Sequence, residues 1–324
     1  MKLATLKDGS RDGQLIVVSR DLGTAHFATG IAQRLQQALD DWNFIAPQLQ
    51  DVYDALNQGR ARHPFPFDPA QCMAPLPRAY QWIVADAYAP IGAAQPAAAE
   101  PPLRQGASDE LLGAQDDIRV GAGQLGIDFG AQLAVVTADV PLRATPEQGL
   151  DAVRLLMLTN EVSLRQLAGS DDDDAAPSDW PAAAFSPVAV TPDELGEAWQ
   201  AGRVHLTLQT TWNGRKVGLC DAGAGMRWSF GELVARAARA RRLRAGTVIG
   251  SGVVRPAAVD TDGRPEWPQG YGRIADKRAM ERLQDGAAST DYMQPGDTVR
   301  IDMRGRDGQP VFGVIEQEVV DLAA

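Results

Sequence analysis

Short runs of apolar and β-branched residues, separated by turn residues, predict that the second half of the chain is rich in β-strands. The predicted strands lie near 133–137, 204–212, 216–219, 247–250, 297–303 and 310–318. Arg-Asp-Gly at 306–308 joins the last two and is a hairpin signal. Helical spacing predicts helices over 146–156 and 229–244. The second of these begins after Ser229 and has Glu232 three residues later, the pattern of a capping box.

The first part of the chain has a different pattern, which predicts a small α+β unit. Residues 14–28 predict a hairpin with its turn at Asp-Leu-Gly, and residues 31–59 predict helices broken at Pro47 and closed by Gly59. The proline-rich stretch 64–77 then predicts a domain boundary near residue 75. We therefore expect an α+β chain with a small N-terminal domain over 1–75 and a larger domain over 76–324.

One predicted strand carries an unusual pair of residues in its middle. In 126-GIDFGAQLAVVTADVP-141, alternation places Asp128, Gly130 and Gln132 on one face. A glycine weakens a strand interior and leaves nothing to pack, and it often marks the close approach of a ligand or another backbone. This face of the strand is therefore a candidate site.

Composition excludes several classes of partner. The 324 residues include 31 basic and 42 acidic ones, a net charge of −11, which disfavours nucleic acid and anionic lipid as main partners. The basic cluster 236–244 is expected to solvate a helix face rather than to bind an anion. No apolar run of about 18 residues exists to cross a membrane, and the N-terminus turns polar at once, so we expect a cytoplasmic protein.

Other motifs are weaker. The two cysteines and three histidines lack the spacing of a zinc site or a catalytic dyad. Residues 121–126 match the dinucleotide fingerprint G-x-G-x-x-G, but a strand is predicted after them where the fingerprint needs a helix. The aspartate run at 171–174 is expected to be a solvated loop rather than a cation site.

Several segments together resemble the fumarylacetoacetate hydrolase family in its bacterial two-domain form. They match in order and spacing along nearly the whole chain: 73-MAPLPRAYQW-82, 126-GIDF-129 with 133-LAVVTADVP-141, 160-NEVSLR-165, 185-FSPVAVTPDELG-196, 212-WNGRKVG-218, 246-GTVIGSG-252 and 296-GDTVRIDM-303. The resemblance implies a mixed β-roll of packed sheets and a homodimer. It also implies a divalent cation, held by carboxylates, that polarises acylpyruvate-type or 2-oxo acid substrates.

The residues that should hold this cation are largely replaced. By the resemblance, the family's Glu-x-Glu pair falls on Gly130 and Gln132, and its Asn-Asp pair is Asn160-Glu161. Four further family residues, an Asp, a His, a Lys and a Thr, correspond to Val84, Ile91, Trp180 and Val253. Glu161 with a neutral Gln132 is too weak a ligand set for Mg²⁺, which gives up its water reluctantly. We therefore expect no catalytic metal and no cofactor.

The remaining polar residues are candidates for chemistry without a metal. Glu161 in an apolar pocket is a candidate general acid or base, and Arg104 a candidate clamp for a carboxylate or enolate oxygen. Asp86 and Tyr88 are further catalytic candidates. For Asp86, Tyr88 and Arg104 a solvated loop position is the alternative. The predicted pocket is lined by Gly130, Gln132, Trp180, Ile91, Val84 and Val253.

Three functions follow as hypotheses. The first is a repurposed, metal-independent enzyme of tautomerase, lyase, dehydratase or cyclase type, acting on an enolisable and rather hydrophobic β-dicarbonyl-like substrate. The second is a catalytically inactive homodimer that serves as a binding or scaffold protein. The third is a metal-dependent acylpyruvate hydrolase whose site is rearranged around Asp86, Asp128 and Glu161.

Overall fold

Strands from both parts of the chain join in one long mixed sheet. The computed structural model describes all residues except 90, 92–98, 122–124, 167–179, 256–268 and 323–324. The spatial order of this sheet is β4 (Phe65–Pro66), β3 (Thr24–Phe27), β2 (Gln14–Val18), β1 (Lys2–Leu6), β13 (Ala189–Val190), β10 (Val153–Asn160), β9 (Ala131–Thr137), β18 (Thr247–Gly250), β5 (Gln81–Ala85) and β6 (Leu103–Gly106), with β12 (Ala184–Phe185) also paired to β10.

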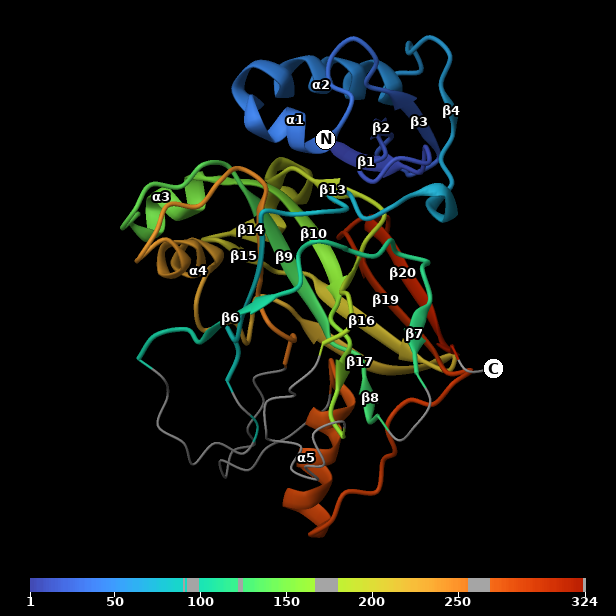
Figure 1. Cartoon of the computed structure of the whole chain (residues 1–324), viewed down its shortest axis with the longest axis vertical. Helices are drawn as coiled ribbons and strands as arrows, with labels where there is room; N and C mark the ends of the chain where they lie inside the picture. Colours follow the sequence, from blue (N-terminus) through green and yellow to red (C-terminus); the bar gives the residue numbers. More distant parts are fainter. Residues whose placement is uncertain (90, 92–98, 122–124, 167–179, 256–268, 323–324) are drawn as a thin grey trace.

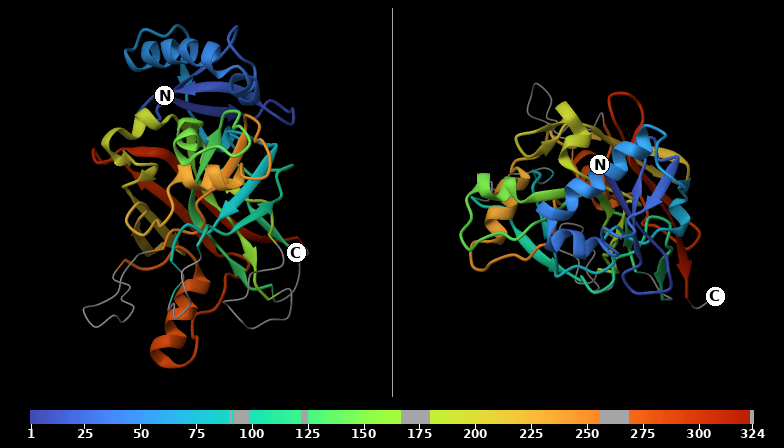
Figure 2. Two further views of the ribbon diagram at one scale, coloured as in Figure 1. Left: turned by 90° about the vertical axis from the view of Figure 1, so that its left-hand side faces the viewer. Right: turned by 90° about the horizontal axis from the view of Figure 1, so that it is seen from above.

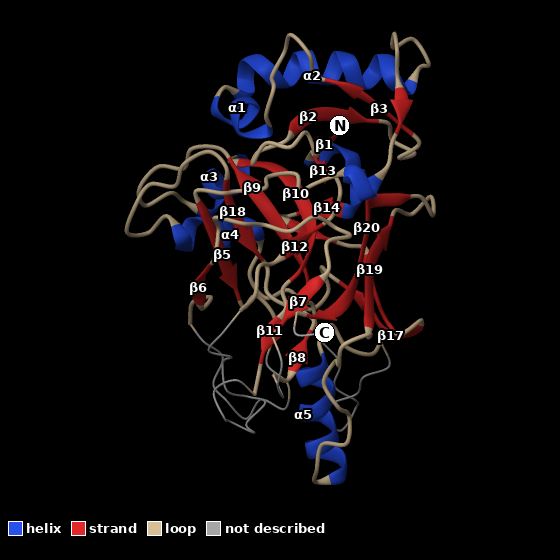
Figure 3. Ribbon diagram, turned by 45° about the vertical axis from the view of Figure 1, so that its right-hand side comes forward, coloured by secondary structure: helices blue, strands red, loops and turns tan. Residues whose placement is uncertain are grey.

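A second sheet packs against the centre of the first. Its order is β17 (Arg215–Asp221), β16 (Thr207–Trp212), β19 (Thr298–Arg304), β20 (Pro310–Asp321) and β7 (Ile118–Val120). Two short pairs complete the strands of the described residues: β8 (Ile127–Asp128) with β11 (Ser163–Leu164), and β14 (Trp199–Gln200) with β15 (Arg203–Val204). The predicted α+β fold, with packed sheets after a small N-terminal α+β unit, is confirmed (Figures 1 and 3).

The central strands are buried on both faces. Leu133 and Val135 of β9 belong to the core between the two sheets, with Ile301 of β19. Ala134 and Val136 of the same strand belong to the core beneath the N-terminal layer, with Leu3 and Leu39 among their neighbours in that cluster. Burial on both faces explains why these strands have continuous apolar sequences rather than strict alternation.

The N-terminal layer extends the long sheet and covers it with helices α1 (Leu35–Asp40) and α2 (Trp42–Asn57) (Figures 1 and 2). β1 pairs with β13 through Lys2 opposite Val190 and Leu3 opposite Ala189. The predicted 14–28 hairpin is present as β2 and β3. The chain leaves the layer through the 3₁₀ turn η1 (Pro69–Gln71) and continues into β5.

The predicted break at Pro47 was wrong. The helices separate at Asp41, whose φ of −131° and ψ of 45° are not helical, and Pro47 lies inside α2. Pro47 removes one hydrogen bond near the start of α2, and the apolar face formed by Ile45, Leu49 and Tyr53, all buried, offsets this loss. The predicted end at Gly59 is confirmed, since this glycine has a φ of +66° just beyond α2.

Two other predicted helices are shorter than expected. α3 covers Pro146–Asp151 only, and the apolar run that follows is strand β10. The prediction extended the helix into this run because a short buried strand and a buried helix can have the same composition. α4 (Phe230–Ala237) begins with the predicted Ser229–Glu232 capping box but ends well before residue 244. The 3₁₀ helix η2 (Pro192–Ala198) follows β13.

Helix α5 (Ile274–Asp285) projects from the end of the molecule opposite to the N-terminal layer (Figures 1 and 2). It ends at Gly286, which has a φ of +83°. The Glu281 side chain then accepts hydrogen bonds from the backbone N–H groups of Ser289 (2.7 Å) and Thr290 (2.9 Å). No helix in the described part of the chain is both long and apolar enough to span a membrane.

Glu281 provides a pH-dependent test of this end of the fold. Burial opposes its ionisation, but hydrogen bonds from Thr290 and Ser289 prevail and lower the pKa of the carboxyl to about 2. Because its folded pKa lies below the unfolded value of about 4.3, its stabilisation is present above that pH and is lost as the pH falls toward 2. We expect Glu281→Gln to lower the free energy of unfolding at pH 7 by about 1–3 kcal/mol.

The measurement is chemical denaturation of both proteins between pH 7 and pH 2. The difference between them is expected to shrink as the pH falls, whereas Glu318→Gln, at an exposed position of β20, changes stability little at any pH. A difference that stays constant over this range would contradict the role assigned to Glu281.

Candidate functional site

Glu161 is the centre of the candidate site and follows directly after β10. β10 pairs with β9 so that Asn160 lies opposite Ala131, and the backbone N–H of Glu161 then donates to the Gly130 carbonyl oxygen (2.9 Å). The side chain is only 8% exposed. Its Oε1 pairs with Nη2 of Arg104, and its Oε2 accepts a hydrogen bond from Nε2 of Gln132 (3.1 Å). Both carboxylate oxygens therefore face hydrogen-bond donors.

The orientation of the Gln132 amide is fixed by the neighbouring strand connection. Its Oε1 accepts a hydrogen bond from the backbone N–H of Gly252 (2.8 Å), so its Nε2 is the atom that faces Glu161. Gln132 is fully buried. Burial raises the pKa of the Glu161 carboxyl, and the Arg104 charge and the hydrogen bonds from Arg104 and Gln132 oppose that rise.

Arg104 supplies the positive charge at this site from the edge strand β6. It lies opposite Val84 of β5, and its guanidinium carbon stands 4.1 Å from the centre of the Trp180 ring, a cation–π contact. Nη1 of Arg104 is buried and has no hydrogen-bond partner among the described residues, while the side chain as a whole keeps 28% exposure. Within the described part of the chain, this buried nitrogen thus has no acceptor.

The structure explains why residue 130, in the middle of the predicted strand, is a glycine. A Cβ atom added there would lie 2.5 Å from the Glu161 carbonyl oxygen and 3.3 Å from Cγ2 of Val253. The Gly130 N–H donates to Oδ1 of Asn160 (2.9 Å). Another stretch of backbone therefore occupies the space in which a side chain at 130 would begin, so glycine is required at this position.

These residues do not fit the divalent cation that the family resemblance implies. The site offers one carboxylate, Glu161, which already forms an ion pair with Arg104. The other two positions are the neutral amide of Gln132 and Gly130, where there is no space for a side chain. Mg²⁺ and related ions require several oxygen ligands, usually carboxylates. Within the described residues, no group of three or more His, Cys, Asp or Glu side chains is placed to hold a metal ion.

The carboxylates of the proposed rearranged metal site have separate partners. Asp86 pairs with Arg255 (3.2 Å) and keeps 47% exposure. Asp128 is fully buried, pairs with Arg165 (3.0 Å), and accepts hydrogen bonds from the backbone N–H groups of Ile274 and Ala275. Each of Asp86, Asp128 and Glu161 is thus engaged by a different arginine.

The remaining predicted site residues differ in how close they come to Glu161. Tyr88 is buried and its hydroxyl donates to the Ala222 carbonyl oxygen (2.8 Å), so it is committed to the core. Val84 is buried in β5 beside Arg104, and Ile91 is half-buried between residues outside the described part. The structure therefore groups Glu161 with Gln132, Gly130, Arg104, Trp180 and Val253.

Sequence reasoning missed the backbone N–H of Gly252, which fixes Gln132. The Gly-Ser-Gly turn at 250–252 was a usable signal, because Gly252 has a φ of +77° and a Cβ there would lie 2.3 Å from the Ala85 carbonyl oxygen. The ion pairs between Arg255 and Asp276 and between Arg165 and Asp128 have no comparable signal in the sequence.

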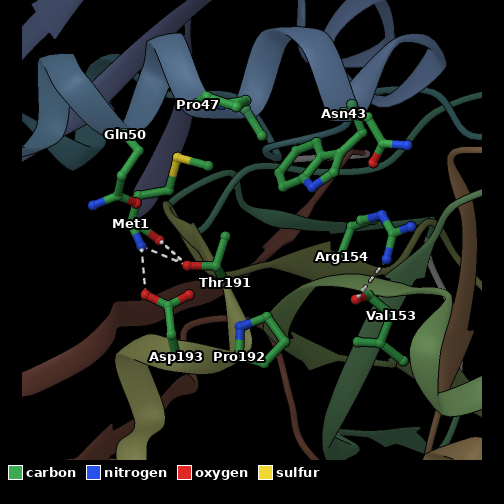
Figure 4. Close-up of a pocket in the computed structure, with 11 residues that line it drawn as sticks. Met1, Asn43, Pro47, Gln50, Val153, Arg154, Thr191, Pro192 and Asp193 are labelled. Carbon is green, nitrogen blue, oxygen red and sulfur yellow. Dashed lines mark hydrogen bonds and ion pairs between the residues drawn. The ribbon is translucent and has the colours of Figure 1, made fainter.

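A separate hollow lies between α2 and the start of β10 (Figure 4). Trp42, Pro47, Arg154, Thr191 and Asp193 are among its lining residues. Nη1 of Arg154 donates to the Asp151 carbonyl oxygen (2.6 Å). This hollow is at the first residues of β10, whereas Glu161 follows the last residue of that eight-residue strand, roughly 25 Å away at about 3.3 Å per residue. It is therefore not part of the Glu161 site.

Two family models together match nearly the whole chain. The family model for the fumarylacetoacetase N-terminal domain 2 matches residues 1–78, and the model for the fumarylacetoacetate hydrolase C-terminal domain matches residues 79–320. No curated protein sequence matches the chain.

Solved structures share the fold at low sequence identity. A fumarylacetoacetate hydrolase from Exiguobacterium antarcticum is 19% identical with a TM-score of 0.67, covering 99% of both chains. A maleylpyruvate hydrolase from Sphingobium sp. SYK-6, solved with manganese(II) and pyruvate, is 16% identical with a TM-score of 0.66 and covers 99% of both. A 2-hydroxyhepta-2,4-diene-1,7-dioate isomerase from Mycobacterium marinum is 19% identical, with a TM-score of 0.62 and complete coverage of both.

The packing around Gly130 gives a direct test of this geometry. We expect Gly130→Ala to destabilise the protein by about 1–3 kcal/mol, because the added Cβ must displace the Glu161 backbone. The matched control is Gly121→Ala, where no atom of the described residues lies within 4 Å of an added Cβ, and its effect should stay within about 0.5 kcal/mol. Thermal unfolding of both variants makes the comparison, and equal stability would contradict the close approach described above.

Proposed function

The chain belongs to the fumarylacetoacetate hydrolase family, and we propose that it is a metal-independent enzyme that moves a proton on an enolisable β-dicarbonyl-like substrate. The observation that carries the proposal is the buried carboxylate of Glu161, held between the cation of Arg104 and the amide of Gln132. The reaction types that use such a step are those of a tautomerase, lyase, dehydratase or cyclase. The fold is shared by proteins named as isomerases and as hydrolases, so it accommodates more than one reaction type.

Glu161 is the proton-transfer group of the proposed mechanism. A hydrogen on the carbon between two carbonyl groups is acidic, and the Glu161 carboxylate accepts it while the electron pair of the C–H bond moves to a carbonyl oxygen as an enolate. Return of the proton to a different atom completes a tautomerisation. Burial, which raises the pKa of Glu161, brings the carboxyl closer to the pH at which acid–base catalysis is most efficient.

Arg104 stabilises the enolate in this proposal. Its Nη1 has no partner among the described residues and is the donor assigned to the enolate oxygen. A guanidinium remains charged at all physiological pH values, so it provides the positive charge that a Lewis-acidic cation would otherwise supply. Trp180 supports one face of the guanidinium, and the apolar side chains of Val84 and Val253 favour a rather hydrophobic substrate.

The same ion pair also favours a second candidate function, a catalytically inactive homodimeric binding or scaffold protein. A carboxylate with both oxygens occupied is a stable, charge-compensated arrangement that needs no substrate. A metal-dependent acylpyruvate hydrolase with a rearranged site is the third candidate, and it requires Asp86, Asp128 and Glu161 to exchange their arginine partners for an ion.

The first experiment follows exchange of the hydrogens between the two carbonyl groups for deuterium by NMR. Acetylacetone, acetylpyruvate and benzoylpyruvate serve as probes, with chelator-treated protein. We expect exchange above the background rate, reduced about 10²–10⁴-fold by Glu161→Gln, because the base is removed. We also expect a reduction of about 10²–10³-fold by Arg104→Met, because the oxyanion loses its donor. The matched control is Glu197→Gln, whose side chain is 86% exposed, and it should exchange at the wild-type rate.

The outcomes separate the three candidates. Exchange in the presence of chelator supports the proposal. Binding of a probe without any exchange supports the scaffold protein, and exchange that appears only after Mn²⁺ or Mg²⁺ is added supports the metal-dependent hydrolase. Either of the last two results overturns the proposed function.

The pH profile provides an independent check on Glu161. The base must be ionised, so the exchange rate rises with pH as Glu161 loses its proton. Because burial raises the pKa of this carboxyl, the midpoint should lie above the ordinary glutamate value of about 4.3. The profile of the Arg104→Met variant should be shifted further upward, since the cation that favours the carboxylate is gone. A rate independent of pH between 4 and about 8 would exclude Glu161 as the base.

A further inference from the structure

Asp128 is a buried carboxylate that the mechanism does not use. Its Oδ1 accepts a hydrogen bond from the backbone N–H of Ile274 (2.6 Å), and its Oδ2 accepts from that of Ala275 (3.1 Å) and from Nε of Arg165 (3.0 Å). Ile274 and Ala275 are the first two residues of α5, whose N-cap residue Arg273 provides no side-chain cap. Asp128 therefore caps α5 from a distant strand and compensates the positive end of its dipole.

Residues 128–130 also contact the segment that carries Glu161. In the β8–β11 pair, Asp128 lies opposite Ser163. Two residues further on, Gly130 accepts from the Glu161 N–H (2.9 Å) and donates to Oδ1 of Asn160 (2.9 Å). Residues 128–130 thus contact both the first turn of α5 and the Glu161 segment, and Figure 3 shows β8 beside the start of α5.

Neighbouring contacts make this arrangement rigid. Ala131 donates its N–H to the Gly272 carbonyl oxygen (3.0 Å) and accepts from the Val254 N–H (3.0 Å). Phe129 stacks on Tyr271, with ring centres 6.3 Å apart and an angle of 16° between the ring planes. The sequence directly before α5 is therefore packed along residues 129–131, which directly follow Asp128.

An ion network also holds the first turn of α5. Asp276 pairs with Arg273 (2.6 Å) and Arg255 (3.1 Å), and Arg255 reaches Asp86 (3.2 Å), which follows β5. Asp276 is 1% exposed and the Arg255 side chain is 7% exposed. Buried pairs of this kind are costly to break, so they hold the elements that they join in a single arrangement.

We propose that Asp128 is a positioning residue for Glu161: by capping α5 it fixes residues 128–130, and these set the place of the Glu161 backbone relative to Gln132 and Arg104. This inference rests on the proposed function in assigning a chemical role to Glu161. It differs from a purely structural role, in which Asp128 stabilises α5 without any effect on the geometry of the site.

The test compares Asp128→Asn with Glu281→Gln. Asparagine has the shape of aspartate but brings an N–H₂ group against donors, the Arg165 Nε and the α5 N–H groups. Glu281 anchors the residues after the other end of the same helix through the backbone N–H groups of Ser289 and Thr290, so its variant weakens the α5 region at the end far from Asp128. The readouts are the NMR signals of the Glu161 backbone amide and the Gln132 side-chain amide, with hydrogen exchange at the Glu161 N–H.

For a folded Asp128→Asn protein we expect both amide signals to shift and exchange at the Glu161 N–H to rise at least about tenfold, a loss of protection worth about 1.4 kcal/mol. For Glu281→Gln we expect a lower melting temperature with the Glu161 and Gln132 signals unchanged. Unchanged signals in Asp128→Asn, or equal shifts in both variants, would overturn the inference.

A second variant covers the case in which Asp128→Asn does not fold. The double variant Asp128→Asn with Arg165→Met removes both charges of the pair and leaves no isolated buried ion from it. It should produce the same shifts, and wild-type signals in it would equally overturn the inference. These NMR readouts do not depend on catalytic activity. A failure of this inference can therefore be distinguished from a failure of the proposed function, which the deuterium exchange tests.

Discussion

The contact between the Arg104 guanidinium and the Glu161 carboxylate is the interaction on which the character of this site depends. A buried carboxylate is stable only when a cation, a metal ion or a proton compensates its charge. In this chain the compensation comes from a side chain on the edge strand β6, and the amide of Gln132 satisfies the second oxygen. The region that the family resemblance assigns to a metal thus contains a charge-balanced group made only of protein atoms.

The backbone around this group explains why the balance is not easily changed. Gly130 is in contact with the Glu161 carbonyl oxygen at the point where any side chain would begin, and Gln132 is held by the Gly252 N–H. A carboxylate at 130 would need the 160–161 segment to move away from β9. That segment is held in turn by Asn160, whose side chain accepts from Gly130 and donates to Gln317. The glycine at position 130 and the close approach of the 160–161 backbone are therefore parts of one arrangement.

Part of this could be predicted from the sequence because it follows from local rules. Alternation along 126–141 placed Gly130 and Gln132 together, and both lie against Glu161; the capping box at Ser229 gave the start of α4. The fold followed from the family resemblance rather than from periodicity. The prediction failed where tertiary burial decides the outcome, as in β10, whose apolar run has the composition of a helix as well as of a strand.

The contacts between residues far apart in the sequence had no local signal. Arg104 lies in β6 and Glu161 follows β10, and the capping of α5 by Asp128 joins residues 146 positions apart. In a sequence, Asp128 is simply an acidic residue on the same face as Gln132, which suggests a metal ligand. Its actual partners are an arginine and a helix N-terminus, both of which compensate a negative charge as a cation would.

The same physical requirement therefore recurs at each carboxylate near the site. Glu161, Asp128 and Asp276 are all buried, and an arginine balances each of them. An arginine differs from a metal ion in one respect that matters for chemistry: its donors point in fixed directions within a plane, and they cannot be displaced by water or chelators. Under the proposed function, we therefore expect a substrate to be oriented by the guanidinium plane and by the Trp180 ring that packs against it, an arrangement that favours a flat, conjugated anion such as an enolate.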